Sequence, residues 1–401
     1  MKKSLAFLSL ILCLNTVLNA QGITDQSGNE ADLQLNTITT AVPFLIIGPD
    51  AKSGGMGDVG VASDPDAMSM HWNPAKYAFV DDDFGIAVAY TPWLRALIPD
   101  INLSYISGYA RTNERETFGF ALRYFTLGEI KFTSETGESM GFFNPNELAL
   151  STAYARKLSD QFSTAISLRY IYSNLTGKAY VGTQATNAGQ SIAGDISAYY
   201  ESPIRLAGKD VVWAMGLNIS NIGSKIAYTE TVDKDFLPTN LRIGSSLTTD
   251  IDEYNRISFE FDINKLLVPT PPITEDGEIV SGEDPDVSVI SGIFQSFSDA
   301  PSGDREVREL IYSTGFEYWY DQQFAVRTGY FYEHPTKGDR QFLSLGAGLK
   351  YNVFGLDFSY LIPVRSRDES GVVNPLSNTL RFALTFDFGA LKAQEATPSE
   401  E

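Results

Sequence analysis

From residue 84 to residue 388 the sequence alternates large apolar residues with small or polar ones, with a period of two. In the first segment of this kind Phe84, Ile86 and Val88 alternate with Gly85 and Ala87. A period of two is typical of β-strands, because successive side chains of a strand point to opposite faces. We count about 14 such segments, each suited to a tilted membrane crossing of about 9–11 residues. They centre on residues 84–90, 101–105, 118–124, 148–154, 162–172, 196–200, 213–219, 241–247, 257–263, 310–318, 324–332, 343–351, 354–360 and 380–388.

Two kinds of fold could carry this alternation, a soluble β-sandwich and a membrane β-barrel. In a sandwich the face opposite the core carries long charged side chains that meet water. Here that face is dominated by Gly, Ala and Ser with isolated charges, which suits the confined lumen of a barrel. Tyr and Trp near the segment ends match the aromatic girdles of such barrels. We therefore predict an all-β fold, a transmembrane antiparallel β-barrel of about 14 strands over residues 83–389, located in the outer membrane.

The connections between these segments alternate between short and long. Brief turns such as Asp321-Gln322 and Asn352 join some pairs, and long stretches join the others. Outer-membrane barrels have short periplasmic turns and long external loops, so we expect both termini on the periplasmic side. The longest connection runs from about Leu266 to Val307 and is rich in proline and then in acidic residues. Its acidic run suits a solvated loop better than a calcium site, because no EF-hand spacing occurs.

One part of this long connection has helical rather than strand periodicity. Ile290, Ile293, Phe294 and Phe297 fall at i, i+3, i+4 and i+7, which predicts a short helix with one apolar face. In an external loop such a face must either pack on the mouth of the barrel or bind a partner protein. Both interpretations stay open at this point.

The start of the chain has the pattern of a secretory signal peptide. Lys2 and Lys3 precede an apolar stretch, and Ala20 offers a small residue for cleavage. The single cysteine, Cys13, lies inside that stretch, so the mature chain would carry none. We expect a signal peptide at 1–20, a flexible N-terminal segment at 21–40, a non-alternating segment at 41–82, the barrel at 83–389 and a polar tail at 390–401.

Charge and composition exclude several functions. The chain has 30 Lys+Arg against 50 Asp+Glu, a net charge of −20, so it lacks the basic surplus that binding to nucleic acid requires. No H-E-x-x-H motif occurs. His71 lies beside Trp72, where a hydrogen-bonded structural role suits it better than catalysis, and His334 precedes Pro335 in an expected external turn. We predict no enzyme activity, no cofactor and no metal site.

Residues 41–82 do not alternate and contain three short motifs. Residues 55–60 fit G-x-G-x-x-G, but a dinucleotide site needs a helix opening there, and Asp64-Pro65 breaks the chain too soon. We interpret the segment as a plug inside the lumen, whose glycines let its backbone approach the barrel wall closely. The motif residues are Gly54, Gly55, Gly57, Asp64, Asp66, Asn73, Pro74 and Ala75.

The order of these motifs ahead of a 14-strand barrel resembles the FadL-like outer-membrane family, in which such a segment folds into the lumen. The full string PFLIIGPDAKSGGMGDVGVASDPDAMSMHWNPAKYAF is more closely similar to the PorV (LptO) branch, outer-membrane proteins of the type IX secretion system. This resemblance implies a non-enzymatic role. Proteins of the branch receive cargo that carries a C-terminal signal domain from the SprA/Sov translocon barrel, and they deliver it to an attachment complex with the PorU sortase.

The FadL-like resemblance leaves a second function open, the transport of hydrophobic small molecules. Such a conduit needs an apolar path through the lumen. Charged side chains in a lumen hold a plug by hydrogen bonds more naturally than they pass an acyl chain. The expected lumen positions that carry charge are Arg123, Arg169, Glu260, Asp262, Arg327, Lys350, Asp357, Arg381 and Asp387.

Overall fold

A computed structural model describes residues 36–98, 100–133, 139–177, 180–181, 184–229, 234–275, 278–300, 302–365 and 373–389. The expected signal peptide at 1–20, most of the segment at 21–40 and the tail at 390–401 lie outside these residues. Within the part of the chain that is described, no helix combines the length and the apolar character needed to cross a membrane.

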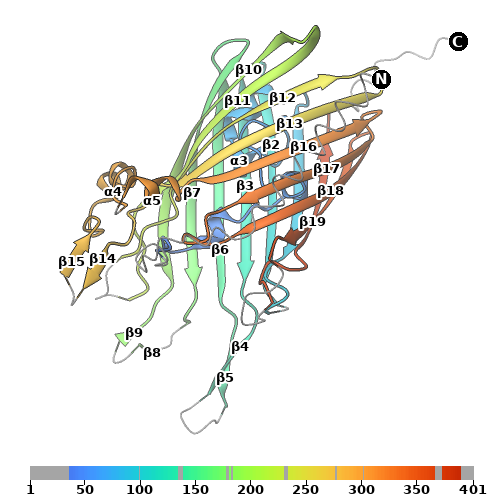
Figure 1. Cartoon of the computed structure of the whole chain (residues 1–401). Coiled ribbons are helices and arrows are strands. Elements are labelled where there is room, and N and C mark those ends of the chain that lie inside the picture. The colour runs from blue at the N-terminus through green and yellow to red at the C-terminus, as the bar shows by residue number, and fades with distance from the viewer. Residues whose placement is uncertain are drawn as a thin grey trace, which may run out of the picture. The chain divides into compact units, whose positions relative to one another are not determined.

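Fourteen strands of the described residues form one closed barrel, in which each strand pairs antiparallel with its neighbours (Figure 1). Strand β1 pairs with β20 to close the ring, with Gly85 opposite Asp387. Closure gives the backbone groups of every barrel strand a partner, as a membrane-spanning sheet requires. The predicted fold class and strand number are therefore confirmed. The barrel strands are β1 (Phe84–Pro92), β2 (Asn102–Asn113), β3 (Glu116–Thr126), β6 (Asn146–Lys157), β7 (Phe162–Asn174), β10 (Gly189–Leu206), β11 (Lys209–Gly223), β12 (Asn240–Asp250), β13 (Asn255–Leu266), β16 (Ile311–Tyr320), β17 (Phe324–Tyr332), β18 (Gln341–Tyr351), β19 (Phe354–Pro363) and β20 (Leu380–Asp387).

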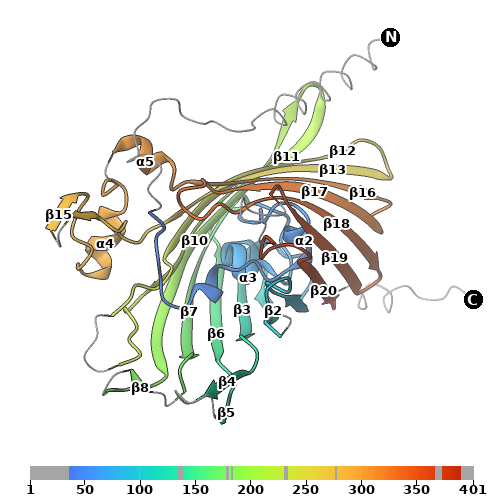
Figure 2. The ribbon, with the colours of Figure 1, turned by 60° about the horizontal axis from the view of Figure 1, so that its bottom comes forward.

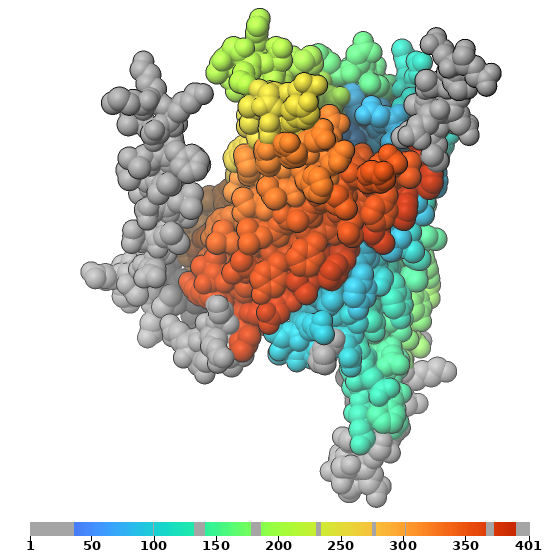
Figure 3. Space-filling view, turned by 90° about the vertical axis from the view of Figure 1, so that its right-hand side faces the viewer, coloured from blue at the N-terminus to red at the C-terminus, as the bar shows by residue number. Residues whose placement is uncertain are grey.

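The alternation in the sequence decides which side chains face outward. In β1, Val88 and Tyr90 are 42% and 45% exposed, whereas Ala87 and Ala89 are buried on the inner face. Large apolar side chains thus cover the outside, which is the surface that lipid hydrocarbon solvates, and small ones leave room inside. The wall of β16–β19 shows this outer surface as a continuous face (Figure 3).

Strand β2 departs from this pattern. Its apolar residues Leu103 and Tyr105, which the sequence suggests as one apolar face like the others, are buried and point into the barrel. Register fixes this direction, because Ser104 lies opposite outward-facing Tyr90 and Ile106 lies opposite Val88. The apolar face of this strand is used inside the barrel, where it packs against the N-terminal part of the chain.

The two ends of the barrel differ in the length of their connections, as predicted. At one end tight turns join β10 to β11 through Ala207 and Gly208, both with positive φ, and join β18 to β19 through Asn352. Two positive φ values in a two-residue hairpin match the right-handed twist of the strands. At the other end the connections carry hairpins and helices of their own: β4 (Ile130–Thr133) with β5 (Ser139–Phe143), β8 (Tyr180–Val181) with β9 (Gln184–Ala185), β14 (Ile273–Glu275) with β15 (Glu278–Ser281), α4 (Val289–Gln295) and α5 (Gly303–Val307).

Residues 41–80, which we call the inner segment, lie within the ring of strands (Figure 2). Four short helices form within it: η2 (Pro43–Ile46), α2 (Ala51–Gly54), α3 (Ser69–Trp72) and η3 (Pro74–Phe79). None is long enough to be stable alone, so tertiary contacts must hold them.

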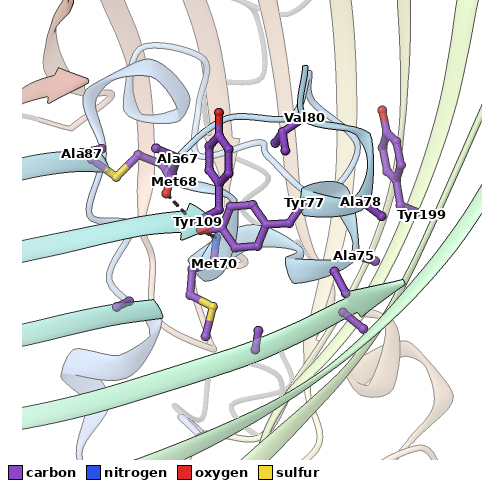
Figure 4. Packing of buried hydrophobic residues seen from close by; sticks show 14 of the residues in the cluster. Ala67, Met68, Met70, Ala75, Tyr77, Ala78, Val80, Ala87, Tyr109 and Tyr199 are labelled. Atoms are coloured by element: carbon purple, nitrogen blue, oxygen red, sulfur yellow. Dashed lines mark hydrogen bonds between the residues drawn. The ribbon is translucent and has the colours of Figure 1, made fainter. Parts of the chain in front are cut away.

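The largest apolar cluster of the described residues joins the inner segment to the inner face of the strands (Figure 4). Tyr77 of η3 lies 5.6 Å from Tyr109 of β2 between ring centroids, and its hydroxyl accepts from the backbone N–H of Met70 at 3.0 Å. The same hydroxyl donates to the carbonyl of Ala67 at 3.0 Å. Each buried tyrosine hydroxyl of this kind needs a partner, and here the inner segment supplies its own.

Candidate functional site

The glycines of the first motif lie against the backbone of the barrel wall. A Cβ on Gly57 would stand 2.7 Å from the backbone N and O of Tyr330 in β17, and Gly57 itself has a φ of +72°. A Cβ on Gly55 would stand 2.9 Å from the Cα of Gly346 in β18. The N–H of Gly57 also donates to the hydroxyl of Ser344 at 2.7 Å. These positions therefore bring two backbones together at a distance that no side chain would allow.

The barrel wall also carries glycines at this contact, and the sequence analysis did not identify them. A Cβ on Gly329 would lie 2.1 Å from the carbonyl carbon of Met56, and one on Gly315 would lie 2.6 Å from the Cβ of Met56. Gly315, Gly329 and Gly346 sit on the neighbouring strands β16, β17 and β18. The alternating pattern places all three at inward-facing positions, and this was the only sign in the sequence that they could contact the inner segment.

Two lumenal arginines hold the inner segment by its charges and carbonyls. Arg123 of β3 donates from Nη1 to the carbonyls of Phe44 and Leu45 at 2.8 and 2.7 Å. Arg381 of β20 is fully buried and pairs with the carboxylate of Asp58. Charge-assisted hydrogen bonds of this kind are among the stronger ones, and a buried guanidinium requires them.

Some lumenal carboxylates bond the inner segment, and others bond neighbouring strands of the wall. Asp262 of β13 accepts from the N–H groups of Gly60 and Val61 at 2.8 and 3.1 Å. By contrast, Arg327 of β17 bonds Glu317 of the adjacent strand at 2.5 Å, an ion pair within the wall. The expectation that lumenal charges hold the segment therefore applies to some of them, and others link strands to each other.

The Asn-Pro-Ala motif forms a tight, fully bonded turn at the start of η3. Asn73 accepts from the N–H of Ala75 at 3.0 Å, and its amide donates to the carbonyls of Val61 and Ala198 at 2.9 and 3.0 Å. Pro74 occupies the first helical position, where its missing N–H leaves nothing unpaired. One side chain thus caps a helix and ties the inner segment to itself and to β10.

The two motif aspartates meet basic side chains. Asp66 bonds Lys52 at 3.0 Å, and Asp64 lies 3.2 Å from the guanidinium of Arg256 in β13. Burial would raise the pKa of Asp66, but Lys52 and Lys76 outweigh burial and hold the pKa of that carboxyl below its usual value. The carboxylate is therefore charged and serves as a structural anchor.

The histidines occupy structural positions. Nδ1 of His71 lies 2.8 Å from the guanidinium of Arg123, and burial together with that charge holds the pKa of His71 well below its usual value. Neutral His71 thus accepts a hydrogen bond from Arg123. The neighbouring Trp72 indole donates to Asp50, a carboxyl whose pKa burial and Asp66 raise to about 6. His334 bonds to Thr336 within its own turn.

A cavity of about 700 Å³ lies between the inner segment and the wall, and its lining is rich in charge. Asp66, Glu201 and Asp387 face it together with Arg256 and Lys350. It belongs to the short-turn end of the barrel, because the turn residues Asp321, Gln322 and Asn352 also line it. A charged vestibule of this kind gives no apolar path for a hydrophobic molecule.

A second cavity lies on the other side of the inner segment, with Ile46, Trp93 and Phe331 in its lining. Its volume is about 50 Å³. Since one water takes about 30 Å³ of liquid, this space cannot hold an acyl chain.

The helix predicted around residue 290 is present as α4, capped by the side chain of Ser288. Gly292 packs against Phe236 and Pro269, so the opposite side of the helix points away from the protein. Ile290 and Phe294 are 61% and 72% exposed. Of the rest of the predicted stripe, Phe297 is 48% exposed and Ile293 is half-buried. The stripe is therefore largely exposed within the described part of the chain.

Comparison with solved structures gives several barrels of low sequence identity. The toluene transporter TbuX of Ralstonia pickettii is 12% identical over 86% of this chain and 100% of its own, with a TM-score of 0.44. The toluene transporter TodX of P. putida is 11% identical over 86% and 99%, with a TM-score of 0.47. A FadL homologue of Pseudomonas aeruginosa is 10% identical over 88% and 100%, with a TM-score of 0.40.

No curated protein matches the chain significantly. The family described as "Type IX secretion system protein PorV" does match, over residues 29–273, which is more than half of the chain. Together with the closed 14-strand barrel, this match shows that the chain is an outer-membrane protein and belongs to the PorV family.

Proposed function

We propose that the protein is a carrier in type IX secretion and not an enzyme. It receives secreted cargo by the C-terminal signal domain at a SprA/Sov-like translocon barrel, and it delivers that cargo to an attachment complex with a PorU-like sortase. Membership of the PorV family supports a role in this secretion system. The observation that carries the carrier role is the exposed apolar face of α4, which nothing in the described chain covers.

The alternative, a FadL-like conduit for hydrophobic small molecules, fits the interior less well. The inner segment is bonded to β3, β10, β13, β18 and β20, and the larger space beside it is lined by charges. We propose that this segment closes the lumen as a plug. A barrel whose lumen is closed must act through its surfaces, and an exposed apolar patch beside the external mouth is a surface of the kind that binds proteins.

Affinity purification from detergent-solubilised outer membranes tests this function. A variant with Ile290→Asp and Phe294→Asp adds two charges to the apolar face of α4. The matched control, Ser291→Asp with Ser298→Asp, adds the same charge at exposed polar positions of the same connection. Mass spectrometry of the co-purified proteins then gives the partners of each form.

We expect the control and the unaltered protein to retain both a giant barrel and secreted proteins that share a C-terminal domain. The α4 variant should lose them while its barrel still folds, as heat-modifiable gel mobility reports. Retention of both partners by the folded α4 variant would contradict the proposed binding face. Recovery of neither partner by the unaltered protein would favour the conduit instead.

A further inference from the structure

The described residues of the connection between β13 and β16, namely 267–275, 278–300 and 302–310, lie outside the ring of strands, and we call them the external excursion (Figure 2). It is fixed to the outer wall of the barrel by Lys265. This residue has the outward parity of Ile263 and Phe261 in β13, yet it is only 5% exposed. Its ammonium group lies 2.7 Å from Glu306 and 2.7 Å from Glu309.

Other groups complete this buried network. Glu309 also accepts from Lys337 at 2.8 Å and from the hydroxyl of Thr270 at 2.6 Å. Glu306 accepts from the N–H of Ala300 at 3.2 Å. A lysine on the lipid-facing side of a barrel is costly unless it is covered and paired, and the excursion does both. Glu306 and Glu309 lie close to Asp299, and three carboxylates so placed could hold a metal ion. Here Lys265 and Lys337 pair with these two glutamates instead.

Next to this network the excursion and the barrel wall enclose an apolar groove of about 240 Å³. One side is the outer face of the barrel, with Leu241 and Ile243 of β12 and Ile263 of β13. The other side is the excursion. Its apolar lining residues are Phe297, Val307 and Leu310.

The polar residues that line the groove are already satisfied. They are Lys265 and Glu306, which bond each other at 2.7 Å. A segment of protein entering the groove would bring backbone N–H and C=O groups that find no partner there. A hydrocarbon chain brings no such groups.

The groove is also continuous with the membrane surface of the barrel. Ile243 and Val307, one from each side, are 41% and 59% exposed. The wall of β12 and β13 on which the groove lies is the surface that lipid hydrocarbon covers. Since the excursion belongs to the end of the barrel with long connections, the groove faces the outer leaflet.

We propose that this groove binds an acyl chain of an outer-leaflet lipid. The lipid fills the space beneath α5 and supports the excursion against the outer wall, below the network around Lys265. This binding site is distinct from the proposed cargo-binding face of Ile290 and Phe294, which do not line it, although Phe297 of the predicted stripe does.

Crosslinking with a photoreactive lipid tests the site. The full-length mature barrel is reconstituted in vesicles of phosphatidylcholine that contain a fraction with a diazirine on one acyl chain. After illumination, digestion and mass spectrometry locate the adducts. We expect adducts on Phe297, Val307 and Leu310, and we expect the substitution Val307→Asp to abolish them. Adducts on the open lipid face around Phe259, which is 52% exposed, should persist in both forms and serve as the internal control.

A second measurement separates a lipid from a protein occupant. A photoreactive amino acid placed at position 307 is activated in intact outer membranes, and the adduct is analysed by mass spectrometry. A lipid adduct supports the proposal. A protein adduct would overturn it in favour of a partner interface. Absence of vesicle adducts on Phe297, Val307 and Leu310 while the Phe259 region is labelled would overturn it as well.

Discussion

Substitution of Gly57 by alanine tests the contact between the inner segment and the wall. Gly57 has a φ of +72°, and a left-handed conformation costs a residue with a Cβ roughly 1–2 kcal/mol. The added Cβ would also lie 2.7 Å from the N and O of Tyr330 and 2.9 Å from the O of Thr314. These are backbone atoms of paired strands and cannot turn aside, and overpacking of this kind costs about 1–3 kcal/mol. We expect a total loss of about 2–5 kcal/mol.

A control separates the two contributions. Gly208 also has a positive φ, +82°, but nothing lies within 4 Å of its added Cβ. The variant Gly208→Ala should therefore show the backbone cost alone. Gly303 has neither the positive φ nor a neighbour within 4 Å, so Gly303→Ala should leave stability almost unchanged.

The assay is urea unfolding of the refolded barrels in vesicles, followed by gel mobility, together with limited proteolysis within residues 41–80. Gly57→Ala should lower the free energy of unfolding by about 1–3 kcal/mol more than Gly208→Ala and should speed cleavage of the inner segment. If the two variants lose the same stability and the segment stays protected, the strands can shift to make room for the added methyl group, and our reasoning is wrong.

Three other perturbations test other parts of the structure. Because the pKa of buried Asp50 is raised from 3.8 to about 6, the folded protein holds a proton there that the unfolded chain releases. Stability should therefore fall as pH rises between these values, by at most about 3 kcal/mol, and a urea-unfolding series across pH should show Asp50→Asn flattening that fall. Leu217→Arg on the lipid face of β11 should cost roughly 2–4 kcal/mol and impair assembly, whereas Ser220→Arg should be milder; equal heat-modifiable mobility of the two would refute the facing. Deletion of residues 54–75 should raise single-channel conductance in planar bilayers, and an unchanged conductance would mean that the inner segment does not close the pore.

Sequence periodicity predicted the barrel because a strand has only two faces. Once one face must meet lipid, the choice of residues at every second position follows, and segments such as 84–90 show it directly. Strand β2 shows where this reasoning stops. Leu103 and Tyr105 are buried inside the barrel, where they pack against the inner segment. Alternation alone cannot tell whether an apolar face of a strand points to lipid or into an apolar part of the lumen. Only pairing with β1 decides their direction.

The site was less accessible to sequence reasoning, since its partners are far apart along the chain. The glycines of the inner segment were visible as a motif, but the wall glycines Gly315, Gly329 and Gly346 look like ordinary small lumenal residues. Likewise, the outward parity of Lys265 is a signal that something must cover it. Nothing local to β13 indicates that Glu309, 44 residues later, does so.

The structure assigns different tasks to the three surfaces of the barrel. The inner face makes hydrogen bonds and close contacts to the inner segment, so some of its charges hold that segment in place, while others such as Arg327 and Glu317 pair within the wall. The outer face is mostly apolar, and Lys265 on this face pairs with the external excursion, which sets the excursion beside the membrane. The exposed side chains of Ile290 and Phe294 take part in neither arrangement. Exposed apolar side chains lower stability and make no compensating contact within the described chain. This is the physical reason to look for the binding of cargo or translocon at α4.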